Sequence, residues 1–394
     1  MLAEINPGPT PRSHLVATPD ASPNAGAGEL IHISIAAPGI SRRRVGKGFS
    51  YLGPDGARIT DRRELGRIRA LVIPPAWTQV WISSDPNGHI QAVGFDAKGR
   101  KQYRYHPQFR EQRDSAKFER LVAFAEALPA LRARVAKDMR VAGLGRNKVL
   151  ATVVHLLETT MIRVGNAAYA RDNKSYGLTT LRNRHVKIDG GALRFDFKGK
   201  SGKIWRLSIH DRRIARIVRA CQELPGQHLF QYLDDDGRRQ AVTSGDVNAY
   251  LKAVSGADVT AKDFRTWTGT VLAARALAEF EAAASIATAK RNLNQAIKLT
   301  AARLGNTPTI CRKSYIHPAI QAAYLEGELA LEIVETVAGD PTAGAGLDPV
   351  EAAVLAFLSA RRTSDELTNR DEAKVVHGPW PGLASGAIST PQSH

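Results

Sequence analysis

The stretch from Leu304 to Tyr315 constrains this sequence most, because a helix stop, a helix start and a reactive side chain follow one another closely. Gly305 comes after a long helical pattern and suits the left-handed conformation that ends a helix. Thr307 and Pro308 predict the N-cap and the first residue of the next helix. Tyr315 then lies about two turns into a short helix. A tyrosine in such a place usually packs against the core, so a functional role for Tyr315 has to be supported by residues elsewhere in the chain.

The charge of the chain indicates a polyanionic partner. Lysine and arginine number 55 against 38 aspartate and glutamate in 394 residues, a formal net charge of +17. Ribosome binding, DNA coating and nucleic-acid enzymology would each produce this excess. The hydrophobic fraction of 43% suffices for a sizeable core.

Cysteine use and hydropathy bear on the compartment. Cys221 and Cys311 lie far apart without metal-ligand spacing, which predicts a reducing environment. No apolar run reaches membrane-spanning length, and the N-terminus lacks the pattern of a signal peptide. We therefore expect a cytoplasmic protein that does not enter a membrane.

Composition and periodicity change several times along the chain. Residues 1–28 are rich in Pro, Ala, Gly and Ser and predict a disordered tail. Residues 29–110 alternate short strand-forming segments with Pro-Asp-Gly and Pro-Asn-Gly turns, which predicts a small β-rich domain with one helix near 61–71. Residues 111–335 are mainly helical, and 336–394 predict an extension with one short helix and a flexible tail.

The β-rich domain ends in a segment that mixes basic and aromatic residues. On a strand, Tyr103 and Tyr105 fall on one face and Gln102 and Arg104 on the other. Together with Lys101 they suit a DNA groove, because cations neutralise phosphates and glutamine can pair with an adenine edge. A solvated basic edge strand would have the same composition.

One sheet is expected within the helical domain. Apolar residues alternate on either side of the turn Gly199-Lys200-Ser201-Gly202, which predicts a three-stranded antiparallel sheet within residues 178–209. Lys200 would sit at the hairpin tip, where a lysine is ordinarily solvated. The helices expected around this sheet span residues 114–163, 211–221, 244–254, 263–280 and 286–304.

Two arginines stand at predicted helix ends. Arg163 follows a helical stripe, where a cation can simply interact with the helix dipole. Arg265 lies in the first turn of its helix, where the helix dipole disfavours a cation. A bound anion at this end would explain why an arginine stands there.

Arg163, Arg265, Lys200 and Tyr315 can be combined into a phosphoryl-transfer site that needs no metal. The arginine forks would hold the non-bridging oxygens and stabilise a pentavalent transition state. The tyrosine would attack and leave a covalent phosphotyrosine, while the lysine protonates the departing sugar oxygen. Religation would then need no ATP, so we expect no cofactor, and no Walker-type glycine loop is present.

These residues resemble the motifs of the type IB DNA topoisomerases, specifically the compact poxvirus-like form found in bacteria. The resemblance runs from about Gly46 to about Ala330. It implies relaxation of supercoiled duplex DNA through transient single-strand cleavage and a 3′-phosphotyrosyl intermediate. The matching segments are Ile162-Arg163-Val164-Gly165, Phe197-Lys198-Gly199-Lys200, Lys262-Asp263-Phe264-Arg265-Thr266, and Tyr315 nine residues beyond Asn306.

The same resemblance implies a fold and partners. It implies an α+β protein whose β-rich N-terminal domain and larger, mainly helical catalytic domain form a C-shaped clamp around duplex DNA. Tyr169 and the strand from Lys101 to Tyr105 would contact that DNA. We expect a monomer associated with the nucleoid, working without metal or cofactor.

Asn306 departs from the family pattern, which has a histidine there. In the family that histidine donates a hydrogen bond to a phosphate oxygen. An asparagine amide can donate the same bond without a positive charge, so we expect Asn306 to act with the other four residues in an active enzyme. The alternative is that Asn306 only helps to end the helix behind Gly305.

Other functions remain open from the sequence. Tyrosine recombinases share the catalytic plan, but their second arginine usually follows a histidine in His-x-x-Arg, and here that position is Lys262. A non-catalytic DNA-binding protein would explain the charge but not the matched residue types. The run Asp234-Asp235-Asp236-Gly237 is compatible with a magnesium site, although a polar turn is the commoner role for such a run.

Overall fold

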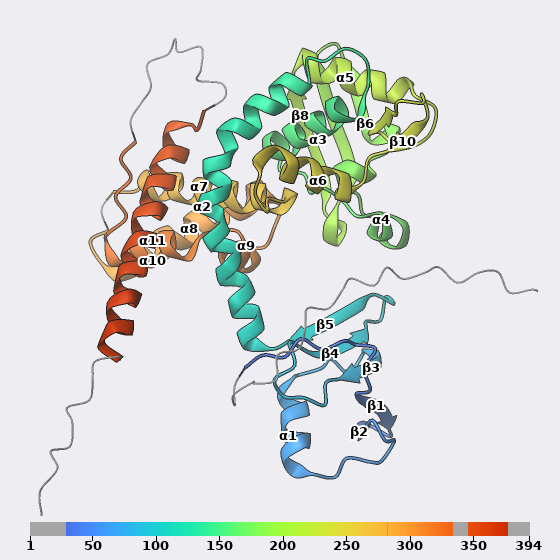
Figure 1. The fold of residues 1–394 in the computed structure, drawn as a ribbon, viewed down its shortest axis with the longest axis vertical. Helices are drawn as coiled ribbons and strands as arrows, with labels where there is room; N and C mark the ends of the chain where they lie inside the picture. The colour runs from blue at the N-terminus through green and yellow to red at the C-terminus, as the bar shows by residue number, and fades with distance from the viewer. Residues whose placement is uncertain (1–28, 282, 334–345, 377–394) are drawn as a thin grey trace, which may run out of the picture. The chain divides into compact units, whose positions relative to one another are not determined.

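The computed structural model describes residues 29–281, 283–333 and 346–376 (Figure 1). The chain divides into two compact units, Met1–Ser115 and Ala116–His394. It is a mixed α/β protein, with a sheet in the first unit and mostly helices in the second. The predicted tails at 1–28 and after Val376 lie outside the described residues.

The first unit is built on one antiparallel sheet of five strands in the order β2-β1-β3-β4-β5. Ile40, Ile82 and Ala92 of the sheet pack with Ile68 of α1 in a small core. The Asp61 carboxylate caps α1 by accepting from two backbone amides. The elements are β1 (Ile40–Val45), β2 (Gly48–Leu52), α1 (Arg62–Ala70), β3 (Thr78–Ile82), β4 (Ile90–Phe95) and β5 (Lys101–Tyr105).

Strand β1 was not expected, so the predicted set of strands was incomplete. Its sequence, Ile-Ser-Arg-Arg-Arg-Val, has no apolar alternation. Arg42 in its middle donates hydrogen bonds to the carbonyls of Ile73, Pro74 and Trp77, and its guanidinium lies over the Phe49 ring. These tertiary contacts stabilise a charged residue that local pattern would place in solvent.

The second unit is mainly helical and carries the three-stranded antiparallel sheet β6-β7-β8 that the sequence predicts. Helix α2 begins in the first unit and continues into the second. The elements are α2 (Pro107–Asp138), α3 (Arg146–Thr160), α4 (Ala167–Asn173), β6 (Val186–Asp189), β7 (Ala192–Lys198), β8 (Ile204–His210), α5 (Arg212–Glu223), β9 (Gln231–Leu233), β10 (Arg239–Ala241), α6 (Ser244–Ser255), α7 (Ala261–Ala278), α8 (Ile286–Leu304), α9 (Pro308–Ser314), α10 (Pro318–Glu326) and α11 (Pro349–Val376).

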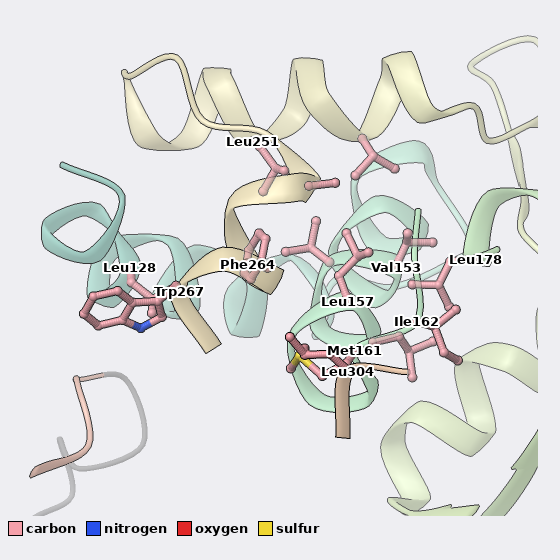
Figure 2. Packing of buried hydrophobic residues seen from close by; sticks show 14 of the residues in the cluster. Leu128, Val153, Leu157, Met161, Ile162, Leu178, Leu251, Phe264, Trp267 and Leu304 are labelled. Atoms are coloured by element: carbon pink, nitrogen blue, oxygen red, sulfur yellow. The ribbon is translucent and has the colours of Figure 1, made fainter. Parts of the chain in front are cut away.

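A large apolar core joins α2, α3, α7 and the end of α8. In Figure 2, Trp267 of α7 lies near Leu128 of α2, while Met161 and Leu304 lie together at another edge of the cluster. At this second edge the carbonyls of Met161 and Leu304 accept hydrogen bonds from the same arginine, Arg265.

The prediction that residues 178–209 hold the only sheet of this unit was wrong. Strands β9 and β10 form a second, two-stranded sheet around the acidic run. Its turn is closed by Asp234, whose carboxylate accepts from the Arg238 amide at 2.7 Å and from Gln240 at 2.9 Å. The first aspartate of the run therefore has the role that a polar turn requires.

The predicted extension contains one helix, α11, but this helix is much longer than the short helix expected. Asp348 and Glu351 cap it reciprocally, each carboxylate accepting from the other's backbone amide. Leu358 is buried and Leu355 half-buried, and the helix continues to Val376. Among the described residues, no helix is long and apolar enough to span a membrane.

Candidate active site

The junction between α8 and α9 forms as the sequence predicts. Gly305 ends α8 with φ of 65°, and Thr307 caps α9, whose first residue is Pro308. Tyr315 is the C-cap of α9, with φ of −136°, rather than a residue inside the helix. The side chain of Tyr315 therefore leaves the chain where the helix ends, and it packs half-buried against the core.

Arg265 is almost completely buried, with 3% of its surface exposed. Asp263, two residues before the arginine, accepts from the amide and hydroxyl of Thr260, and this cap begins α7 at Ala261. The guanidinium donates to the Met161 and Leu304 carbonyls, the latter at 2.6 Å. Its Cζ lies 5.2 Å from the centroid of the Tyr315 ring. Three helix ends therefore meet at one cation beside the tyrosine.

Positive charge around Tyr315 changes its acidity. Burial raises the pKa of the tyrosine, but Arg265 and Arg163, with a smaller contribution from Lys200, lower it below its usual value. Burial and the neighbouring Arg163 lower the pKa of Arg265 to about 10. The net effect is that deprotonation of Tyr315 is easier than for an ordinary tyrosine.

Arg163 and Asn306 contact each other directly, although 143 positions separate them. Arg163 donates through Nη2 to Asn306 Oδ1 at 2.5 Å. Arginine has only donors, so the amide oxygen must face it and the amide nitrogen must point elsewhere. The backbone amide of Asn306 bonds to the Ala301 carbonyl as part of the helix end, and the side chain takes no part in that cap.

The loop that carries Arg163 is held by its backbone. The Arg163 carbonyl accepts from the Leu178 amide at 2.9 Å, and the Val164 carbonyl accepts from Thr179 at 2.7 Å. Gly165 has φ of 102°, and a Cβ there would lie within about 3 Å of Thr180 and Gly177. The glycine of Ile-Arg-x-Gly thus permits the close packing that fixes the arginine.

Lys200 occupies the connection between β7 and β8, as predicted. The turn end of this hairpin lies against the α8–α9 junction, since a Cβ at Gly305 would be 2.9 Å from the Trp205 ring and 3.4 Å from Lys203 Nζ. Trp205 in turn stacks on Phe197, with 6.3 Å between ring centroids. The exposed Lys200 side chain is therefore carried on a hairpin that is packed against the site.

The predicted DNA-contacting strand belongs to the first unit. Tyr103 and Tyr105 share a face and stack with centroids 5.8 Å apart, which confirms the predicted alternation. Gln102 donates to Asp96 at 3.0 Å, and Arg104 donates to the Val72 carbonyl at 2.8 Å. Lys101 is exposed beside the Tyr103 ring.

Tyr169 belongs to the second unit, where it is 48% exposed on α4. Its amide bonds to Asn166, which caps the helix directly after the Arg163 loop.

Sequence reasoning missed the residues that hold the tyrosine's main chain. Gly269 and Thr270 of α7 pack against the Tyr315 carbonyl, and Lys117 of α2 donates to the carbonyl of Ser314. Lys117 is 197 positions from its partner, so no local pattern marks it. Among the described residues, no group of three or more His, Cys, Asp or Glu is placed to bind a metal ion.

Comparison with known proteins identifies the family. Residues 106–328 match the family described as eukaryotic DNA topoisomerase I, catalytic core, and residues 48–96 match the bacterial DNA topoisomerase IB N-terminal domain. The chain belongs to the type IB DNA topoisomerase family.

Viral members of this family are similar over most of their length. DNA topoisomerase 1B of Acanthamoeba polyphaga mimivirus is 36% identical over 285 residues, which are 71% of this chain and 85% of that protein. DNA topoisomerase I of Monkeypox virus is 24% identical over 232 residues, 58% of this chain and 70% of that protein. DNA topoisomerase 1 of Rabbit fibroma virus is 26% identical over 231 residues, covering 57% and 68%.

Proposed function

We propose that this topoisomerase-family chain relaxes supercoiled duplex DNA. Tyr315 attacks a phosphodiester and forms a 3′-phosphotyrosyl intermediate, the broken strand rotates, and the freed 5′-hydroxyl religates. Arg163, Arg265 and Asn306 bind the non-bridging oxygens and stabilise the transition state. Lys200 acts as general acid on the leaving 5′-oxygen. The reaction uses neither ATP nor an obligatory metal.

The observation that carries this proposal is a pair of buried N–H groups beside the tyrosine. Arg265 Nε and Asn306 Nδ2 are both buried, and neither has a hydrogen-bond partner in the described part of the chain. Buried donors are nearly always paired in folded proteins, so each requires an explanation. An anionic phosphate bound against Tyr315 would accept from both, and the surrounding positive charge favours that anion.

DNA contacts extend the proposal beyond the catalytic residues. Lys101 to Tyr105 and Tyr169 contact the duplex, and the two units close around it as a C-shaped clamp. The exposed faces of Lys101, Tyr103 and Tyr169 support this role. The amide of Gln102 already binds Asp96, so any base contact by this residue uses its remaining groups. We propose that the enzyme acts as a monomer on nucleoid DNA.

Tyr315→Phe tests the proposed reaction. It removes only the nucleophilic oxygen, so relaxation of a supercoiled plasmid and the covalent adduct should both disappear while duplex affinity stays within about twofold. Gel electrophoresis and fluorescence anisotropy measure the two properties. Persistence of the adduct in this variant would remove Tyr315 from the mechanism. A wild-type protein that recombined DNA without relaxing it would favour the recombinase alternative.

A further inference from the structure

Lys117 of α2 is a buried lysine next to the proposed nucleophile. Its exposed fraction is 4%, and its Nζ donates to the Ser314 carbonyl at 2.6 Å. Ser314 is the last residue of α9, and the following residue is Tyr315. Lysines are almost never fully buried without a partner, because desolvation of an ammonium group is costly. The hydrogen bond to the Ser314 carbonyl therefore has to offset part of the cost of desolvating the Lys117 ammonium group.

The bond fits the geometry of a helix end. The last carbonyls of a helix have no partner within the helix, and a cation at that end is favoured by the dipole. Lys117 reaches such a carbonyl from a different element. It thereby fixes the peptide group that joins Ser314 to Tyr315.

Helix α7 holds the same main chain at the next carbonyl. A Cβ on Gly269 would collide with the carbonyl of Tyr315, so only glycine allows this approach. The Thr270 hydroxyl lies 3.4 Å from that carbonyl and accepts from the His317 amide at 3.1 Å. The Tyr315 backbone is therefore held from two helices, while its ring faces Arg265.

We propose that Lys117 is a positioning residue that holds the 314–315 peptide so that the Tyr315 hydroxyl is aimed at the phosphorus atom. This inference rests on the proposed function of Tyr315. The role is geometric: the groups that lower the pKa of the hydroxyl are Arg265, Arg163 and Lys200, which lie on other elements. A misplacement of about 1 Å in a reacting group can reduce a rate about 100-fold.

Positioning has a kinetic signature that distinguishes it from acid catalysis. Before cleavage Tyr315 has no bond to the phosphate and is placed only by its own backbone and the contacts to it, so loss of the Lys117 contact loosens the tyrosine and slows its attack. In the covalent adduct the phosphorus atom is already bonded to Tyr315 and held by the arginines, so religation depends much less on Lys117. Loss of a general acid, in contrast, slows cleavage and religation alike.

The test is Lys117→Met, which keeps an unbranched stem but removes the donor. We expect single-turnover cleavage of a duplex oligonucleotide to slow about 10- to 100-fold. Religation by the isolated adduct should stay within about threefold, so the equilibrium fraction of adduct falls, and duplex affinity should not change. Arg120→Met is the matched control, because Arg120 lies on the same helix in an exposed pair with Asp258; it should leave both rates unchanged.

A second substrate distinguishes the proposed positioning role of Lys117 from the proposed general-acid role of Lys200. A 5′-phosphorothiolate needs no proton on its leaving sulfur, so it should restore cleavage by Lys200→Ala but not by Lys117→Met. Lys117→Arg keeps a long cationic donor and should cleave faster than Lys117→Met, which tests the idea even if methionine impairs folding.

Three results would overturn the inference: equal slowing of both directions, rescue by the phosphorothiolate, or normal cleavage with only a lower melting temperature. Absence of any adduct in the wild type would instead refute the proposed function itself.

Discussion

Asn306 shows how one side chain acquires a definite orientation from its neighbour. Arg163 offers only donors, so the oxygen of the amide faces it, and Nδ2 is buried without a hydrogen-bond partner among the described residues. Under the proposed function, a neutral amide in this orientation would supply one hydrogen bond to a phosphate oxygen. The competing hypothesis, that Asn306 merely ends α8, has no side-chain cap bond to support it.

Substitutions at Asn306 should separate these hypotheses. Asn306→Ala is expected to slow single-turnover cleavage, with a ceiling of about 10²–10³-fold, because one transition-state donor is lost. Asn306→His should keep most activity. Asn306→Asp should be slower than alanine, because a carboxylate offers no donor and repels the phosphate.

The control for this series is Asn294→Ala, which removes an exposed Asn–Arg hydrogen bond to Arg312 on the neighbouring α9. It should leave the cleavage rate unchanged. A lower melting temperature with normal cleavage in Asn306→Ala would assign the residue to helix capping alone.

The helices behind the site are tied together by one ionic cluster. Arg132 of α2 forms a bidentate pair with Glu351 of α11 at 2.9 Å and also binds Glu158 of α3 at 2.7 Å. Trp267 of α7 donates to Glu351 at 3.0 Å. Glu351 is only 7% exposed. The C-terminal helix is thus bound to the element that carries Arg265, two residues before Trp267.

Glu351→Ala should destabilise the protein strongly. It leaves the Trp267 N–H without its acceptor and gives Arg132 a single carboxylate, and breaking a buried ion pair typically costs about 3–5 kcal/mol. Chemical denaturation measures the free energy of unfolding. Glu326→Ala, which removes a half-exposed partner of Arg361, is the control and should cost less than about 1 kcal/mol. Equal effects would show that the cluster behaves as a surface pair.

His317 caps the N-terminus of α10 with a side chain that can titrate, so the stability of the folded chain is expected to depend on pH. It caps the helix by accepting from the Ala319 amide at 3.1 Å, and its ring meets Phe118 edge-on. Burial, and then the positive charge of Lys117, lower its pKa from 6.5 to about 4. The unfolded chain therefore binds more protons than the folded chain between these values, so stability falls as pH decreases through this window.

His317→Asn should reduce this pH dependence, because asparagine keeps a capping acceptor and does not titrate. The full linkage for His317 amounts to roughly 3 kcal/mol, from about 1.4 kcal/mol for each unit of pKa. Unfolding free energies at pH 7 and pH 4.5 measure the slope. His106→Asn, at the other His-Pro helix start, is the matched control. An unchanged slope in His317→Asn would assign the acid sensitivity to other groups.

At the scale of the whole molecule, the net charge of +17 predicts strongly salt-dependent DNA binding. Each phosphate neutralised by a lysine or arginine contributes about 0.9 to the slope of log K against log salt concentration. Lys101→Ala should therefore make the slope shallower by about one unit if this exposed lysine contacts a phosphate. Arg104→Ala tests the other face in the same titration.

Lys252→Ala, at the exposed C-terminal turn of α6, controls for a general loss of charge. If the slope of log K against log salt concentration were equal in Lys101→Ala and the wild type, β5 would be a solvated edge strand and not a DNA contact.

The sequence by itself determined the features that depend on neighbouring residues. Gly305, Thr307 and Pro308 specify a helix stop and start because cap chemistry acts within a few positions, and the turn at Gly199 to Gly202 specifies a hairpin for the same reason. Only the tertiary structure decided the rest. The Arg163–Asn306 bond spans 143 positions and the Lys117–Ser314 bond spans 197, and strand β1 is held by contacts of Arg42 with a distant loop. No local pattern encodes such pairs, because a buried charge is stabilised by partners that only the folded chain brings within reach.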